Sequence, residues 1–228
     1  MKKIILITFL VCFMFVNNSF ANTIEVELNY GLLPELKYDP NTIKEIKILS
    51  DEYVKTIKER DNFDSVLYYK LNSFIKNNKS SLNSLSALYM IIGMCLLDET
   101  DEFYLLNGEK LIDYLINNYS KHIQGKLAII MKATLLEKRE MNLEAIQLLE
   151  KNYEVILSIE NDSSFQPFLD ELNLKEPDNK YMMAWYYYYL ANIFSKLKDK
   201  NNAVINYNKV IKQYPQTNFA KEAKEKIK

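Results

Sequence analysis

The sequence predicts an all-α protein, organised as a short, irregular α-solenoid of helical hairpins. Helix-breaking residues are scarce, because the 228 residues include only 4 Gly and 5 Pro. Apolar residues recur at spacings of three and four along most of the chain, which is the period of an amphipathic helix. Near the C-terminus two such stretches flank a short polar turn, which predicts a pair of packed helices.

Residues 1–21 have the three parts of a secretory signal peptide. Lys2 and Lys3 form a charged start, an apolar run covers 4–16, and small residues precede a cleavage site after Ala21. The run is shorter than the roughly 20 residues that span a bilayer, so we expect cleavage, with an uncleaved anchor as the alternative. The mature protein is therefore expected to be periplasmic or secreted, without a transmembrane span.

The two cysteines have different expected fates. Cys12 lies in the middle of the apolar run and follows Val11, where a lipoprotein signal carries a small residue, so we interpret it as part of the signal peptide. Cys95 is then the only cysteine of the mature chain, which excludes an intramolecular disulfide. It belongs to residues 85–97, a stretch that is apolar nearly all round, so we expect a buried thiol.

Residues 22–40 are expected to form an extended N-terminal arm. Within it, 23–30 alternate apolar and polar residues, a period of two that is typical of a half-buried strand. Two interpretations stay open: an arm that lies across helices or is disordered, and a strand that pairs with the sheet edge of another chain. Asp39 followed by Pro40 predicts the start of the first helix.

Residues 41–228 are expected to form the helical domain. The first two helices, over about 43–57 and 62–75, carry apolar faces without a repeat signature. The buried helix over 85–97 comes next. The acidic turn at 98–102 lacks the ligand spacing of a calcium loop, so we expect it to be solvated.

The stretch from Trp185 to Pro215 carries the most specific pattern. Its large and small residues follow a fixed order: Tyr187, Leu190, Ala191, Phe194, Ala203, Tyr207, Val210 and Pro215. Ala191 and Ala203 would let two helices approach closely, with the aromatic rings around them. This order resembles one tetratricopeptide repeat. The resemblance implies a scaffold that binds a protein or peptide on a concave surface lined by the first helix of each hairpin.

Earlier parts of the chain match the repeat less closely. Equivalent small residues fall at Gly93, Ala133 and Ala191, with separations of 40 and 58 against about 34 in a regular array. The surplus lies in an insertion at 159–178, expected to be mainly loop with one short helix. We therefore expect about three repeats, preceded by the N-terminal helices and followed by a polar capping helix over 218–228.

The candidate binding groove follows from the repeat. The stripe beside the packed face of each first helix would face the groove, and Trp, Tyr and Asn suit peptide capture. The residues are Trp185, Tyr188, Asn192 and Lys196, with Leu127, Ile130, Thr134 and Lys138 in the preceding hairpin. The alternative, which stays open, is that Trp185 and the tyrosines pack under the insertion.

Residues that carry chemistry are few. His122 is the only histidine; it stands beside Lys121 at a predicted helix start and is expected to be exposed. A metal pair, a glycine-rich phosphate loop and a Gly-x-Ser-x-Gly elbow are all missing from the sequence. Removing Lys2 and Lys3 changes the formal net charge from −1 to −3, which does not favour nucleic acid. We expect no catalytic residues, metal or cofactor.

The resulting hypothesis is a non-catalytic protein- or peptide-binding scaffold or adaptor in the bacterial cell envelope. Residues 214–223 support the location, because they resemble repeat ends in envelope proteins of the tetratricopeptide superfamily, such as outer-membrane-assembly and cell-division accessory proteins. One alternative is a helical domain of an envelope enzyme complex. Another is a structural accessory subunit of an outer-membrane assembly.

Overall fold

The computed structural model describes residues 26–27, 30–59, 64–97, 102–171 and 181–228. Within these ranges the regular structure is helical, apart from one isolated parallel bridge between Lys37 and Ser81. The predicted all-α class is confirmed. The expected signal peptide lies outside the described residues, as do positions 98–101 of the acidic turn.

The helices follow one another closely along the chain. Their bounds are η1 Pro40–Thr42, α2 Ile43–Glu59, α3 Ser65–Asn77, α4 Asn83–Leu97, α5 Glu102–Tyr119, α6 Ile123–Lys138, α7 Asn142–Lys151, α8 Tyr153–Leu157, η2 Ser158–Asn161, α9 Phe165–Glu171, α10 Met182–Lys196, α11 Lys200–Gln213 and α12 Asn218–Lys226. No helix of the described residues is both long enough and apolar enough to cross a membrane.

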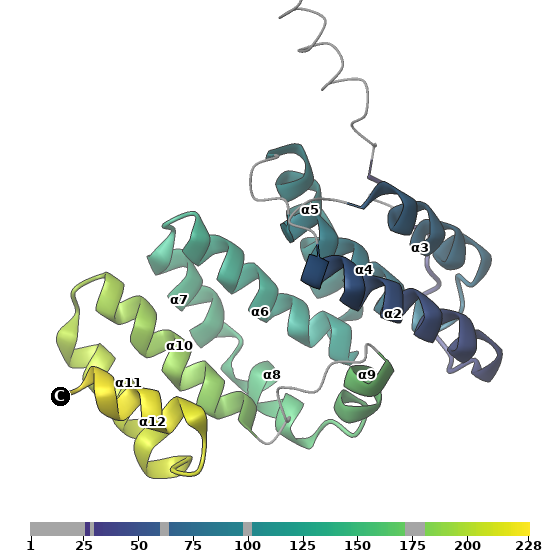
Figure 1. The fold of residues 1–228 in the computed structure, drawn as a ribbon. Helices are drawn as coiled ribbons and strands as arrows, with labels where there is room; N and C mark the ends of the chain where they lie inside the picture. Colours follow the sequence, from purple (N-terminus) through teal and green to yellow (C-terminus); the bar gives the residue numbers. More distant parts are fainter. Residues whose placement is uncertain (1–25, 28–29, 60–63, 98–101, 172–180) are drawn as a thin grey trace, which may run out of the picture.

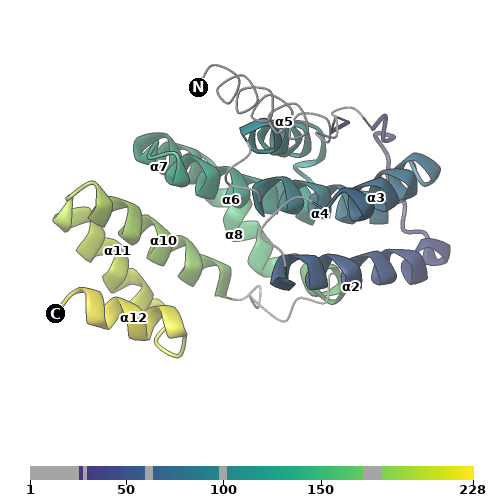
Figure 2. The same ribbon diagram turned by 45° about the horizontal axis from the view of Figure 1, so that its top comes forward.

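The helices stack as hairpins in a short solenoid (Figure 1). The pairs α4–α5, α6–α7 and α10–α11 each pack together, and α5 also packs on α6. Figure 2 shows α2 and α10 on the same side of the row formed by α3, α4, α6 and α7. At one end α2 and α3 cover α4, and at the other α12 covers α10 and α11. This arrangement confirms the expected irregular array of helical hairpins.

Side-chain caps explain where several helices begin. The Asp39 carboxylate accepts a hydrogen bond from Asn41 N at 2.9 Å, and Pro40 opens the first turn, as the sequence predicts. Asp64 caps α3 by accepting from the backbone N–H groups of its first turn. Thr217 caps α12 in the same way. Each cap satisfies a donor that has no partner inside its own helix.

Small residues lie where helices cross. Ala133 and Ala191 are fully buried on the first helices of their hairpins, as the repeat pattern predicts. Gly93 lies close to α2. A Cβ atom at this glycine would lie 2.1 Å from Oη of Tyr53 on α2, so Gly93 makes room for the preceding helical pair. Gly108 of α5 instead approaches Cys95.

The arm before α2 lies against α3 and the turn that follows it. Val26 and Tyr30 are buried, and Glu27 N donates a hydrogen bond to Tyr68 Oη at 2.9 Å. Further backbone bonds join the arm to the turn between α3 and α4. The described residues of the expected strand, positions 26, 27 and 30, are not assigned to a strand.

The described part of the insertion, 159–171, is mostly helical, and positions 172–178 lie outside the described residues. The predicted short helix is α9, and η2 covers the start of the insertion. Asp162 accepts hydrogen bonds from the backbone and hydroxyl of Ser164, just before α9 begins. Pro167 falls in the first turn of α9, where no N–H donor is needed. The buried side chains of Phe165 and Phe168 then hold the helix against the core.

The insertion connects both ends of the array. Helix η2 packs on α10, and Glu160 accepts a hydrogen bond from Met183 N, in the first turn of α10, at 3.0 Å. The side chain of Tyr181, the N-cap residue of α10, makes no cap hydrogen bond. In the other direction, α9 packs on α2. The insertion is thus part of the packing of the fold.

Candidate binding site

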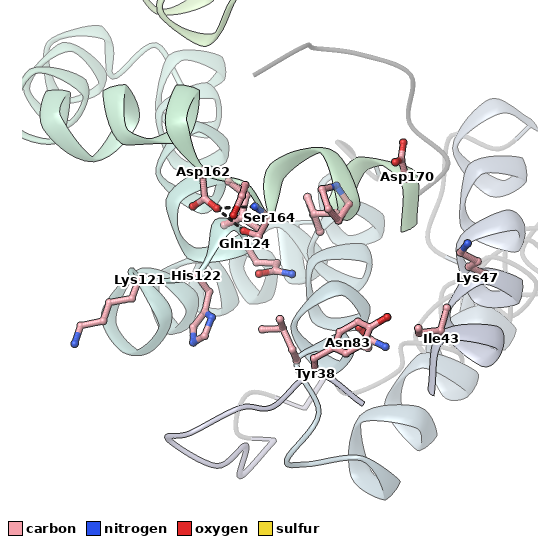
Figure 3. Close-up of a pocket in the computed structure, with 15 residues that line it drawn as sticks. Tyr38, Ile43, Lys47, Asn83, Lys121, His122, Gln124, Asp162, Ser164 and Asp170 are labelled. Carbon is pink, nitrogen blue, oxygen red and sulfur yellow. Dashed lines mark hydrogen bonds between the residues drawn. The ribbon is translucent and has the colours of Figure 1, made fainter. Parts of the chain in front are cut away.

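A cavity of about 600 Å³ lies between α2, the start of α4, the start of α6 and α9; we call it the α6 cavity (Figure 3). Ligand cavities in proteins commonly have this size, with apolar walls and a few polar groups. Its apolar walls are formed by Tyr38, Ile43, Leu82, Ile123, Pro167 and Phe168. Its polar groups are Lys47, Asn83, Lys121, His122, Gln124, Asp162, Ser163, Ser164 and Asp170.

The first turn of α6 forms one wall of the α6 cavity. His122 is the N-cap residue, with extended backbone, and its side chain makes no cap hydrogen bond. The backbone N–H groups of a helix's first turn have no partners inside the helix and carry the positive end of its dipole. This end of α6 is therefore suited to an acceptor group such as a carbonyl oxygen.

His122 is half-buried, which corrects the expectation that it is exposed. Its ring lies 6.2 Å from that of Tyr119. Burial lowers the pKa of His122, and this effect outweighs the opposing pull of the Asp162 carboxylate. The imidazole is therefore mainly neutral at pH 7. It contributes hydrogen-bonding atoms to the cavity rather than a fixed positive charge.

Gln124 is the unusual polar residue of the α6 cavity. Its side-chain amide is 3 % exposed, and Nε2 donates to Ser86 Oγ at 3.2 Å. Among the described residues, Oε1 has no hydrogen-bond partner. A buried carbonyl oxygen without a donor costs about 1–3 kcal/mol, and nearly all such groups in proteins are satisfied. This oxygen is shielded from solvent, so it belongs to the wall of the cavity and is not a group that a ligand can reach in this structure.

Several other polar groups of the rim have partners inside the protein. Lys126 forms a 2.6 Å ion pair with Asp162, and both side chains are about one-seventh exposed. Burial raises the pKa of Asp162, but hydrogen bonds from Lys126 and Ser164 outweigh it, so the pKa falls below its ordinary value. Asn83 donates to Thr42 Oγ1 at 2.7 Å. These bonds fix α9 and α2 around the cavity.

The predicted α10 stripe lies in a different place. Tyr188, Asn192 and Lys196 line a second cavity of about 490 Å³, which we call the α10 cavity. Tyr188 Oη donates to Glu222 at 2.6 Å, and Asn192 accepts from Tyr207 Oη at 2.7 Å. These polar atoms of the stripe are therefore hydrogen-bonded to neighbouring helices.

The other members of the predicted groove do not line the α10 cavity. Trp185 stacks on Tyr189, with ring centres 4.8 Å apart. On α6, Leu127 is buried, Ile130 and Thr134 are half-buried and Lys138 is exposed.

Helix α6 contributes Glu137 to the α10 cavity instead of these residues. Glu137 forms an ion pair with Lys196 and accepts a hydrogen bond from Tyr189 Oη. The structure therefore brings together three of the eight predicted groove residues, all from α10.

Part of the tyrosine run packs under the segment that leads into the insertion. Tyr153 of α8 lies 5.6 Å from Tyr186, ring centre to ring centre. The hydroxyl oxygens of Tyr153 and Tyr187 are 3.2 Å apart. Tyr186 and Tyr187 thus pack against α8, which lies before the insertion, so these contacts do not decide whether the tyrosines pack under the insertion itself.

Sequence reasoning missed the α6 cavity because its walls come from distant segments. The one local signal is a polar Gln124 at the start of an otherwise apolar helix face. Among the described residues, no cluster of three or more His, Cys, Asp or Glu side chains is placed to hold a metal ion. Comparisons with protein families, with characterised proteins and with solved structures give no significant match.

Proposed function

We propose that this protein is a non-catalytic scaffold of the cell envelope that binds a protein or peptide segment in the α6 cavity. The observation that carries the proposal is the cavity itself, which combines apolar walls from four segments with a small set of polar groups. The resemblance of residues 185–215 to a tetratricopeptide repeat supports the class of function. The signal-peptide pattern of residues 1–21 supports the location.

The α10 cavity is the second candidate, because it contains three residues of the predicted groove. Its polar side chains already bond to one another: Tyr207 to Asn192, Tyr188 to Glu222 and Lys196 to Glu137. A ligand there would have to replace existing bonds. The α6 cavity is larger, at about 600 Å³, and much of its wall is apolar, so a ligand there would bury apolar surface.

The test is binding of synthetic peptides by residues 22–228. A library of 12-residue peptides, acetylated and amidated at their ends, would be screened by fluorescence anisotropy. We expect a subset rich in apolar residues to bind with micromolar affinity. Ile43→Trp, which fills the α6 cavity from α2, should weaken binding at least tenfold.

Ile48→Trp is the matched control, because Ile48 is an exposed residue of the same helix outside the cavity lining. It should bind as the wild type does. Circular dichroism would check that both variants are folded. Failure of every peptide to bind, or equal binding by Ile43→Trp and the wild type, would exclude the α6 cavity as the site.

A further inference from the structure

We propose that the C-terminal end of the helical array docks on a membrane surface that contains anionic lipids. The docking surface, which we call the basic end, consists of the turn between α10 and α11, the first turn of α11 and the end of α12. Its exposed lysines and apolar residues are Lys198, Lys200, Lys224, Lys226 and Lys228, with Leu197, Val204 and Ile227. The proposal does not depend on peptide binding in the α6 cavity.

The first step is the uneven charge of the chain. Residues 196–228 contain nine lysines and three acidic residues, a formal net charge of +6. Residues 22–195 contain 18 basic and 27 acidic residues, a formal net charge of −9. Such asymmetry between parts of one chain indicates an anionic partner for the basic part. An anionic surface repels the acidic part, so the protein is expected to approach it with the basic end first.

The second step is the position of the lysines in space. Helix α12 packs on both α10 and α11. Figures 1 and 2 both show the C-terminus on the side of the molecule where the turn between α10 and α11 lies. Lys196, which directly precedes this turn, and Lys226 of α12 line the same α10 cavity. The lysines of the turn and those of α12 therefore contribute to one surface.

The third step is the availability of the charges. Among the described residues, the five lysines of the basic end form no ion pair. The Asp199 carboxylate caps α11 by accepting two hydrogen bonds from Asn202. The Glu222 carboxylate accepts one from Tyr188 Oη. Two of the three acidic residues of this region are thus engaged within the protein, while the lysines stay exposed.

The type of basic residue favours lipid headgroups over a protein or a nucleic acid. All nine basic residues of 196–228 are lysines. Arginine suits carboxylate or phosphate groups that are bound in a fixed bidentate geometry, whereas lysine acts as a compact point charge. A fluid layer of anionic headgroups offers charge without fixed geometry, and clusters of basic residues bind to such surfaces.

The apolar residues of the basic end give a second reason for lipid. Leu197 and Ile227 are each flanked by two lysines in the sequence, and Val204 lies one turn after Lys200 on α11. Each of the three apolar side chains is more than a third exposed. At a membrane they can enter the boundary between headgroups and acyl chains, which adds to the electrostatic attraction. A nucleic acid backbone or an acidic loop offers them no apolar surroundings.

The experiment is co-sedimentation of residues 22–228 with lipid vesicles. One set contains equal parts of phosphatidylglycerol and phosphatidylcholine, and the other contains phosphatidylcholine alone. Each lysine close to an anionic surface strengthens binding about fivefold, so five lysines give a preference for the anionic vesicles on the order of 10³-fold. We expect this binding to weaken as salt is raised, because salt screens the charges.

Two double variants locate the binding surface. Lys198→Gln with Lys226→Gln should weaken binding to the anionic vesicles about twenty-five-fold, at about fivefold for each lysine. Lys44→Gln with Lys58→Gln is the matched control, because it removes the same charge from exposed positions of α2. The control should bind within about twofold of the wild type. Ile227→Ser should weaken binding about threefold through the loss of apolar contact. Circular dichroism would check that all variants are folded.

Equal sedimentation with both kinds of vesicle would overturn the proposal, as would equal binding by the two double variants. Soluble polyglutamate and a single-stranded oligonucleotide would be tested as alternative partners. Binding of either one without binding to anionic vesicles would assign the basic end to an acidic protein or to a nucleic acid instead. The peptide screen contains no lipid, so failure of the vesicle experiment would leave the scaffold function standing.

Discussion

Replacing Gly93 by alanine tests the contact between α2 and α4. Helix propensity alone predicts that a mid-helix Gly→Ala change stabilises the protein by about 1 kcal/mol. The structure predicts the opposite sign, because the added Cβ would lie 2.1 Å from Tyr53 Oη and 3.0 Å from Tyr53 Cζ. Tyr53 is 8 % exposed, so its ring must shift within packed surroundings. Overpacking of this kind costs about 1–3 kcal/mol. We expect a net loss of about 1 kcal/mol.

The assay is urea unfolding of residues 22–228, followed by circular dichroism, with the slope of the transition checked for constancy. The same change would be made in Tyr53→Phe, which removes the atom nearest to the new Cβ. There Gly93→Ala should be less destabilising, because only the ring-carbon contacts at 3.0 and 3.3 Å remain, which gives a measurable coupling between the two positions. Stabilisation by Gly93→Ala in the wild type, or an equal effect in both backgrounds, would refute the reasoning.

Two further predictions concern ionisable groups. Because the pKa of Asp162 is depressed in the folded state, its contribution to stability should be present above the ordinary value of 3.8 and lost as pH falls through the lower, folded value. Asp162→Asn should therefore lower the melting temperature at pH 7, with a gap that narrows in acid; a gap that is constant with pH would contradict this. Burial raises the pKa of Cys95 to about 12, so native protein should label far more slowly than unfolded protein with a thiol-specific disulfide reagent at pH 8. Equal rates would contradict the burial.

The fold was predictable where the determining contacts are local in sequence. The spacing of Ala191 and Ala203 encodes a hairpin whose two helices are joined by a short turn, and Asp39 with Pro40 encodes a helix start. The spacing located Gly93 as a small residue, but its close neighbour Tyr53 belongs to a helix that precedes the regular pattern. A spacing rule can locate a small residue without showing which helix approaches it.

The candidate site was predictable only in part for the same reason. Tyr188, Asn192 and Lys196 share one face of one helix, and they share a cavity. Whether the predicted α6 residues reach the same groove depends on the orientation of α6 relative to α10. The segments α8 and η2 lie in the chain between these two hairpins, so the repeat spacing does not set that orientation. The α6 cavity forms where Gln124 lies near residues from three other segments, and no local sequence pattern predicts that arrangement.

The double attachment of the insertion changes the way in which the array should come apart. In a simple solenoid each hairpin touches only its neighbours, so unfolding can advance from either end. Here Glu160 and η2 hold the start of α10, while α9 holds α2, so one short segment ties together opposite halves of the chain. Loss of either terminal unit removes support from the other. The protein is therefore expected to melt as a single cooperative unit, and its non-local contacts should make refolding slower than in an unbraced array of similar length.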